Sequence, residues 1–168
     1  NKLFVLYTKD MENYTDKLAD DFIKFTKSTK NILKLLYIKI LKLSKIRDKQ
    51  ASIANIDYLP KRKINKQLIL ELASMNFIKS YQNVIVSGCT GSGKSFAIQA
   101  LGNRAIENGY RTYYIRVPTL LEEIKIARAT GTYINTLKKY QRFQLLILDD
   151  FGISQMSSDD AINLLEIL

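Results

Sequence analysis

Apolar and polar positions along the C-terminal two thirds of the chain predict strands and helices in alternation. Short apolar runs are typical of buried strands, and they occur at residues 83–86, 111–117 and 145–148. Elsewhere apolar residues recur every three or four positions, the spacing of one helix face. This spacing predicts helices over residues 67–80, 96–108, 118–129 and 133–140, and a last helix after residue 157. Strands that alternate with helices predict an α/β domain with a parallel sheet.

Residues that start or stop helices support these boundaries. Gly109 and Gly131 lie where a helix is expected to end, and Pro118 stops a strand and opens a helix. Ser157 or Ser158 can cap the last helix. The apolar stripe of the helix over 118–129 is Leu120, Leu121, Ile124 and Ala127, and the last helix contains Leu164, Leu165 and Leu168.

The first fifty residues predict two helices, over about 11–28 and 30–48. On a helical wheel, lysines between Lys30 and Lys49 occupy one half, and apolar residues between Ile32 and Leu43 the other. This is a basic amphipathic helix. Three interpretations remain open: a helix packed on its own domain with solvated lysines, a contact with the DNA backbone, or a helix on a membrane surface. Residues 51–66, which include Pro60 and Lys61-Arg62-Lys63, predict a linker.

Charge and composition narrow the class of protein. Residues 1–66 carry 16 Lys and Arg against 7 Asp and Glu, whereas residues 67–168 carry 10 against 9. The net charge of +10 therefore belongs mainly to the N-terminal part, which predicts a polyanion as its partner. Cys89 is the only cysteine and histidine is absent, which excludes an internal disulfide, histidine-based triads and the usual zinc sites. No apolar run approaches the ~18–20 residues of a membrane span, so we expect a cytoplasmic protein.

The stretch Gly88-Cys89-Thr90-Gly91-Ser92-Gly93-Lys94-Ser95 matches the phosphate-binding pattern G-x-x-x-x-G-K-[ST]. Glycines let successive backbone N–H groups turn toward an anion, and the N-terminus of the following helix adds its dipole. The pattern predicts Lys94 on the β- and γ-phosphates and the Ser95 hydroxyl on Mg²⁺. A Gly/Ser-rich turn with a chance lysine is the alternative. The expected strand before the loop and the helix after it favour a nucleotide site.

The run Leu145-Leu146-Ile147-Leu148-Asp149-Asp150 is an apolar strand that ends in two carboxylates. Ligands bind at the carboxyl ends of parallel strands, so Asp149 is expected to hold Mg²⁺ opposite Ser95. Asp150 is placed to orient or polarise a water. The alternative is a strand that ends in a polar turn, since Phe151-Gly152 follows. Together with the loop, the two aspartates predict Mg²⁺-dependent attack of water on a γ-phosphate.

Several further segments carry a family resemblance. With the loop, they occur in family order: Asn55-Ile56-Asp57-Tyr58, Leu70-Glu71-Leu72-Ala73-Ser74, Leu120-Leu121-Glu122-Glu123 and Leu145 to Gly152. Over residues 51–168 the chain resembles the IstB-like ATP-binding proteins, helper ATPases of bacterial transposons. These proteins are related to DnaC-type helicase loaders within the AAA+ superfamily. Residues 1–50 match the family more poorly, and resemble its DNA-associated region in being helical and basic.

The resemblance implies an ATPase that assembles on double-stranded DNA and directs or activates a transposase. The basic charge of residues 1–66 further predicts contact with the DNA backbone without sequence preference. It implies ATP binding by Gly88 through Phe96 (Gly88, Cys89, Thr90, Gly91, Ser92, Gly93, Lys94, Ser95 and Phe96), and Mg²⁺ binding by Ser95 and Asp149. Lys94, Asp149 and Asp150 are the expected catalytic residues. Residues 56–58 are expected near the adenine, although Tyr58 suits packing better. A homo-oligomer is expected, with no membrane contact.

Two other functions remain open, a replicative helicase loader and a non-catalytic nucleotide- or DNA-binding fragment. The resemblance divides the chain into a basic helical region (1–50), a linker (51–66) and a partial AAA+-like domain (67–168), a P-loop fold incomplete at its C-terminus. The family's sensor, arginine finger and helical lid cannot be located. The family's fourth strand lies between the phosphate-loop strand and the acidic strand. Without it we expect a poorly folded domain, or one in which those two strands become neighbours.

Overall fold

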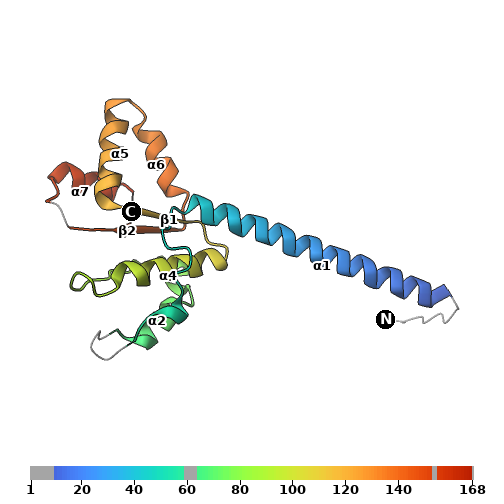
Figure 1. The fold of residues 1–168 in the computed structure, drawn as a ribbon. Helices are drawn as coiled ribbons and strands as arrows, with labels where there is room; N and C mark the ends of the chain where they lie inside the picture. Colours follow the sequence, from blue (N-terminus) through green and yellow to red (C-terminus); the bar gives the residue numbers. More distant parts are fainter. Residues whose placement is uncertain (1–9, 59–63, 153–154, 168) are drawn as a thin grey trace. The chain divides into compact units, whose positions relative to one another are not determined.

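The structure, a computed structural model, describes residues 10–58, 64–152 and 155–167. The chain forms two compact units, residues 1–38 and 39–168. Most of helix α1 belongs to the first unit, and the end of α1 with all later elements belongs to the second (Figure 1). Pro60, Lys61-Arg62-Lys63 and Leu168 lie outside the described residues. The elements are α1 (Asp10–Leu43), a 3₁₀ turn η1 (Ile53–Asn55), α2 (Lys66–Leu72), α3 (Asn76–Lys79), α4 (Lys94–Glu107), β1 (Thr112–Arg116), α5 (Val117–Ala129), α6 (Tyr133–Gln141), β2 (Leu145–Asp149) and α7 (Ser158–Leu165).

Strands β1 and β2 form a parallel pair, in register from Thr112 opposite Leu145 to Arg116 opposite Asp149. Within the described ranges this is the whole sheet. Parallel strands need a long crossover, and helices α5 and α6 supply it. Both strands therefore end at the same edge, where Arg116 and Asp149 lie side by side.

Helices cover both faces of the sheet (Figure 1). Alternate residues of a strand point to opposite faces. On one face Tyr113 and Ile115 pack with Leu120 and Ile124 of α5 and Tyr140 of α6. On the other face α4 lies so close that a Cβ added at Gly102 would be 2.6 Å from the Ile147 side chain. Strand β1 is buried on both faces over Thr112 to Ile115. In β2 only Ile147 is buried and the other four residues are half-buried, so the expectation of a strand buried on both faces holds for β1 and only partly for β2.

Most C-terminal predictions are confirmed. Helix α5 carries its proline in the first turn and buries the predicted stripe of Leu120, Leu121, Ile124 and Ala127. Ser157 caps α7 in a capping box with Asp160, the Ser157 hydroxyl accepting from the Asp160 N–H at 3.1 Å. Gly109 follows α4 with a φ of 83°, in the left-handed region. These boundaries were predictable because each depends on side chains within a few residues of it.

The two helices predicted over 11–28 and 30–48 are one continuous helix, α1. Ser28 and Thr29, at the predicted boundary, are weak helix formers. In the structure the Thr29 hydroxyl donates to the Phe25 carbonyl of the preceding turn at 2.8 Å, so the residue is accommodated within the helix. The helix ends at Leu43, before the predicted boundary, because Lys45 has a φ of 59°. Lys45 and Lys49 are therefore not part of it.

The helix predicted over 67–80 is interrupted. Met75 adopts a left-handed backbone with a φ of 61° and separates α2 from α3. Its side chain is 1% exposed and packs in a cluster with Leu101 and Ala105 of α4. Burial of this long apolar side chain offsets the cost of the unfavourable backbone, which helical periodicity does not reveal.

The prediction that residues 83–86 form a buried strand is wrong. These residues are outside any strand, and Ile85 is 92% exposed. An extended segment becomes a strand only when a neighbour supplies partners for its N–H and C=O groups, and no described strand pairs with this one. The acidic strand β2 pairs instead with β1. One of the two outcomes expected without the family's fourth strand was that the phosphate-loop and acidic strands become neighbours, and this adjacency is not observed among the described strands.

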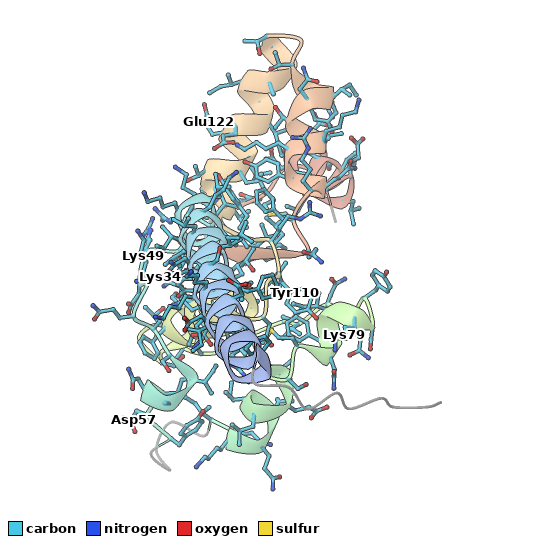
Figure 2. The ribbon with its side chains drawn as sticks, turned by 90° about the vertical axis from the view of Figure 1, so that its right-hand side faces the viewer. Lys34, Lys49, Asp57, Lys79, Tyr110 and Glu122 are labelled. Carbon is cyan, nitrogen blue, oxygen red and sulfur yellow. The ribbon has the colours of Figure 1, made fainter. Side chains whose placement is uncertain are left out.

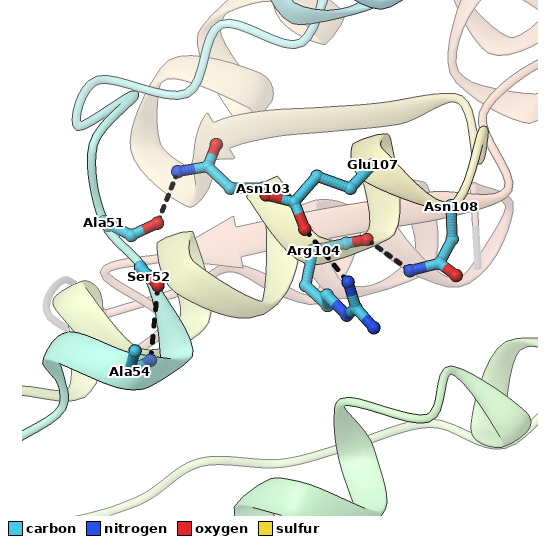
Figure 3. A network of polar contacts seen from close by, with 7 residues as sticks. All are labelled: Ala51, Ser52, Ala54, Asn103, Arg104, Glu107 and Asn108. Atoms are coloured by element: carbon cyan, nitrogen blue, oxygen red, sulfur yellow. Dashed lines mark hydrogen bonds and ion pairs between the residues drawn. The ribbon is translucent and has the colours of Figure 1, made fainter.

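The segment after α1 docks on the sheet and on α4. Ser44 and Ile46 are buried, and the Ser44 carbonyl accepts from the Tyr114 N–H of β1 at 2.7 Å. Asn103 of α4 donates to the carbonyls of Asp48 at 2.9 Å and Ala51 at 2.8 Å. Figure 3 shows the Ala51 contact beside the Ser52–Ala54 bond that opens η1. Residues 44–51 are thus part of the folded domain.

Side chains of α1 in the first unit are exposed on both faces of the helix. Lysines such as Lys30 and Lys34 are exposed, and Lys34 is labelled in Figure 2. Apolar side chains are exposed as well, among them Phe22, Leu33 and Leu36 at 67%, 60% and 50%. The part of the predicted amphipathic pattern up to Lys42 therefore lies on one helix, whereas Lys45 and Lys49 lie beyond its end.

Candidate functional site

The glycine-rich loop leads directly into helix α4. Gly91 and Gly93 have φ angles of 77° and 92°, a region that residues with a Cβ rarely adopt. Gly93 caps α4, so the loop curls around the positive end of a 14-residue helix. The Lys94 ammonium donates to the carbonyls of Gly88 and Cys89, each at 2.7 Å. The lysine charge is therefore held against the first two residues of the loop.

Ser95, in the first turn of α4, contacts the end of β2. Its hydroxyl donates to Asp149 Oδ1 at 3.3 Å, a contact between residues 54 positions apart. Asp149 Oδ1 also accepts from the Asp150 N–H at 2.9 Å, and Asp149 Oδ2 accepts from the Tyr114 hydroxyl at 2.5 Å. The structure thus brings together Ser95 and Asp149, the two residues predicted to hold a metal.

The surroundings of Asp149 favour its ionised form. Partial burial opposes ionisation, but hydrogen bonds from Tyr114, the Asp150 N–H and Ser95 outweigh it and hold the pKa of Asp149 below its ordinary value. Burial and the bond to Asp149 raise the pKa of Tyr114. At neutral pH the pair is therefore a phenol donating to a carboxylate.

Asp150 lies one residue further along, with a φ of 60°. Its carboxylate forms an ion pair with the guanidinium of Arg116, at the end of β1. This contact raises the pKa of Arg116. Sequence reasoning placed Asp150 at the site but did not identify its partner.

A cavity of about 260 Å³ lies beside the start of α4. It is lined by Asn55, Ile56, Asp57, Ile64, Gly93 and Phe96. Residues 56 and 57, expected near an adenine, are therefore next to the loop. Tyr58 packs against the apolar cluster of Ala51, Ile56, Ala97 and Ala100, and its hydroxyl donates to the Ile53 carbonyl at 3.4 Å.

Sequence reasoning missed three residues at this site. Tyr114 and Arg116 lie on β1 and contact Asp149 and Asp150 across the strand pair. Gln99 of α4 is buried, and its amide donates to the Ser95 carbonyl at 3.0 Å. A polar residue at alternate positions of an otherwise buried strand, as in Tyr114 and Arg116, is a signal that could have drawn attention to β1.

The residues present suit a magnesium nucleotide. Mg²⁺ binds oxygen ligands and usually takes one or two from the protein, the others from phosphate and water. The Ser95 hydroxyl and the Asp149 carboxylate, 3.3 Å apart, provide two such oxygens. Among the described residues no three His, Cys, Asp or Glu side chains form a metal cluster, so the ion would depend on phosphate and water for its remaining ligands.

The parallel sheet, its flanking helices and the loop at the start of α4 define a P-loop NTPase-like α/β domain. The chain belongs to the IstB-like ATP binding protein family, whose sequence signature matches residues 20–168. The match begins well before residue 51 and includes most of α1, although the motifs of residues 1–50 resemble the family less clearly than those of residues 51–168 do.

Relatives in this family are ATP-binding proteins of insertion sequences. The chain is 33% identical over 130 residues to that of IS1162 from Pseudomonas fluorescens, covering 77% of this chain and 56% of the relative. It is 34% identical over 128 residues to the insertion sequence ATP-binding protein y4pL of Sinorhizobium fredii, covering 76% and 52%. The chain thus spans about half the length of these curated relatives. No helix in the described part of the chain is long and apolar enough to cross a bilayer.

Proposed function

We propose that residues 88–96 bind ATP, with Mg²⁺ held by Ser95 and Asp149. The observation that carries this proposal is the 3.3 Å contact between these two side chains, which come from the helix after the loop and from the end of β2. Chance glycine-rich turns have no reason to meet an acidic strand end. Lys94 contacts the start of the loop through the Gly88 carbonyl, and its charge would meet the β- and γ-phosphates of a bound nucleotide. In this proposal the adenine would occupy the cavity lined by Ile56 and Phe96.

We infer further that the site serves ATP hydrolysis. Bound Mg-ATP would supply the γ-phosphoryl group and the charge of the metal. Asp149 holds its oxygen toward Ser95, and Asp150 would orient the attacking water once Arg116 releases it. Water adds to the γ-phosphorus as the bond to the β–γ bridging oxygen breaks, leaving ADP and phosphate, and the proton that the water loses passes to a phosphate oxygen or to solvent.

The role of Asp150 can be tested in a relative of full family length. Replacing the residue that aligns with Asp150 by Asn removes the charge but keeps the shape, so ATP binding should persist while turnover stops. The same change at the residue aligned with Asp159, an exposed acid in the first turn of α7, is the control. Full turnover in the Asp150-equivalent variant would contradict the assignment.

A second candidate, nucleotide binding without turnover, is favoured by one observation. The Asp150 carboxylate is engaged by Arg116 rather than left toward the loop. In this alternative Arg116 keeps Asp150 from a water. Replacing Arg116 by Gln would then create or raise hydrolysis, whereas a helper role for Arg116 in hydrolysis predicts a loss.

We propose that the protein acts in DNA transposition, with α1 as its contact to double-stranded DNA and a transposase as its protein partner. Exposed lysines along α1, among them Lys30 and Lys34, suit the phosphate backbone. The names of the relatives associate the family with insertion sequences, which supports transposition over helicase loading. Assembly into a homo-oligomer on the DNA is part of this proposal.

Salt dependence tests the DNA contact. Neutralised phosphates release counterions, so the logarithm of the binding constant should fall linearly with the logarithm of salt, with little preference among duplex sequences. Lys30→Gln with Lys34→Gln should reduce that slope by up to about 2. Lys79→Gln with Lys138→Gln, on exposed positions of α3 and α6, changes the net charge equally and is the control. If the salt dependence of DNA binding had the same slope in both variants, α1 would not be the contact with DNA.

A further inference from the structure

The hydrogen bond from the Tyr114 hydroxyl to Asp149 Oδ2, at 2.5 Å, is shorter than the bonds that Asp149 accepts from Ser95 and from the Asp150 N–H. Tyr114 is 5% exposed and lies on the face of β1 that packs toward α4. Its neighbour Tyr113 packs on the opposite face, with Tyr140 and Phe143. Two adjacent buried tyrosines therefore have different surroundings, and only Tyr114 faces the candidate metal ligand.

The bond from Tyr114 fixes how the Asp149 carboxylate is turned. The terminal torsion of an aspartate is broad and roughly two-fold, so an unrestrained carboxylate rotates easily. Here Oδ2 is occupied by the phenol, and Oδ1 is left toward Ser95 and the Asp150 N–H. One oxygen is thus directed to the side where the loop and Ser95 lie.

Tyr114 is itself held in place by the segment that follows α1. Its N–H donates to the Ser44 carbonyl at 2.7 Å, and the Arg47 guanidinium lies 5.9 Å from the centre of its ring. The same segment is bound to α4, because the N–H groups of Arg47 and Asp48 donate to Gln99 Oε1 at 3.1 and 2.9 Å. Gln99 in turn donates to the Ser95 carbonyl. Both candidate metal ligands are therefore supported from residues 44–48.

We propose that Tyr114 is a positioning residue of the magnesium site, which acts by orienting Asp149 toward Ser95. This rests on the proposed ATP site. Groups that orient metal ligands typically contribute 10–100-fold to metal affinity, and the Tyr114 hydroxyl has the geometry of such a group. A merely structural role would give a different result, since loss of the hydroxyl would then lower stability without changing the response to metal.

The test compares binding of a fluorescent ATP analogue in saturating Mg²⁺ and in EDTA, using the 168-residue chain. The dissociation constant in EDTA divided by the dissociation constant in Mg²⁺ measures how strongly the metal supports binding. Tyr114→Phe should lower this ratio by about tenfold or more while binding in EDTA is unchanged. Tyr113→Phe removes a tyrosine hydroxyl from the other face of β1 and should keep the wild-type ratio. In an Asp149→Asn background, Tyr114→Phe should have no further effect.

The outcomes separate this inference from the ATP site itself. Wild-type binding that is supported by Mg²⁺ and unchanged in Tyr114→Phe would overturn the inference and leave the site standing. A lower ratio that persists in the Asp149→Asn background would also overturn it, since Tyr114 would then act through another group. A wild-type chain that binds no nucleotide in either condition would overturn both.

Discussion

Replacing Ile85 by Ala should leave the stability of the protein almost unchanged. Burying an isoleucine contributes about 1.5–3 kcal/mol, and Ile85 is 92% exposed, so the side chain contributes only ~0.1–0.2 kcal/mol. Ile115 is the contrasting position: it lies in β1, is 6% exposed and packs against Leu120 and Ile124 of α5. Truncating a buried isoleucine costs about 2–5 kcal/mol, from lost burial and the cavity that remains.

Urea unfolding followed by far-UV circular dichroism measures both variants. With a slope of about 1–3 kcal/mol per molar urea, Ile115→Ala should move the midpoint by roughly 1 M or more, and Ile85→Ala by less than about 0.2 M. Residues 83–86 have the apolar composition of a strand but no described strand pairs with them. The comparison therefore tests whether apolar composition alone, without a neighbouring strand, is enough to bury Ile85. A midpoint shift for Ile85→Ala as large as that for Ile115→Ala would refute the reasoning and show that 83–86 is a buried strand.

Three further results follow from the packing. Tyr140→Phe removes a 2.5 Å bond to the Glu123 carboxylate and should lower the free energy of unfolding by about 1.5–3 kcal/mol in urea, with Tyr113→Phe as control. Ser157→Ala should cost about 0.5–2 kcal/mol. Separately, hydrogen bonds from Ser157 lower the pKa of Asp160, so the wild type should lose stability as pH falls below the ordinary carboxyl range and through this lowered pKa, and Ser157→Ala should lose less over the same pH range. Gln99→Ala should speed hydrogen exchange at Arg47 and Asp48, and unchanged protection would exclude Gln99 as their acceptor.

Elements with local signals could be predicted from the sequence. Helix α5 has a proline at its start and an unbroken apolar stripe, and α7 has a serine cap with an acid three residues on. The loop from Gly88 to Ser95 has fixed spacing, and so has the acidic end of β2. Each of these depends on residues that are close together in the chain, which is why their positions agree with the structure.

Features that depend on distant partners could not be predicted. The segment 83–86 has the apolar residues of a strand, but a strand also needs a neighbour, and no described strand pairs with it. The left-handed backbone of Met75 depends on its burial against α4. The contacts of Tyr114 with Asp149 and of Arg116 with Asp150 span 35 and 34 residues. Such pairs become visible only when the register of β1 and β2 is known.

Mg-ATP binding by the 168-residue chain is the most direct test of the central claim, that the loop and the end of β2 form one nucleotide site. A fluorescent ATP analogue should bind the wild type, and Lys94→Ala should abolish binding because it removes the charge held against the loop. Lys138→Ala, an exposed lysine on α6, should bind like the wild type. Nucleotide binding that is equal in Lys94→Ala and the wild type, or absent from both, would contradict the account.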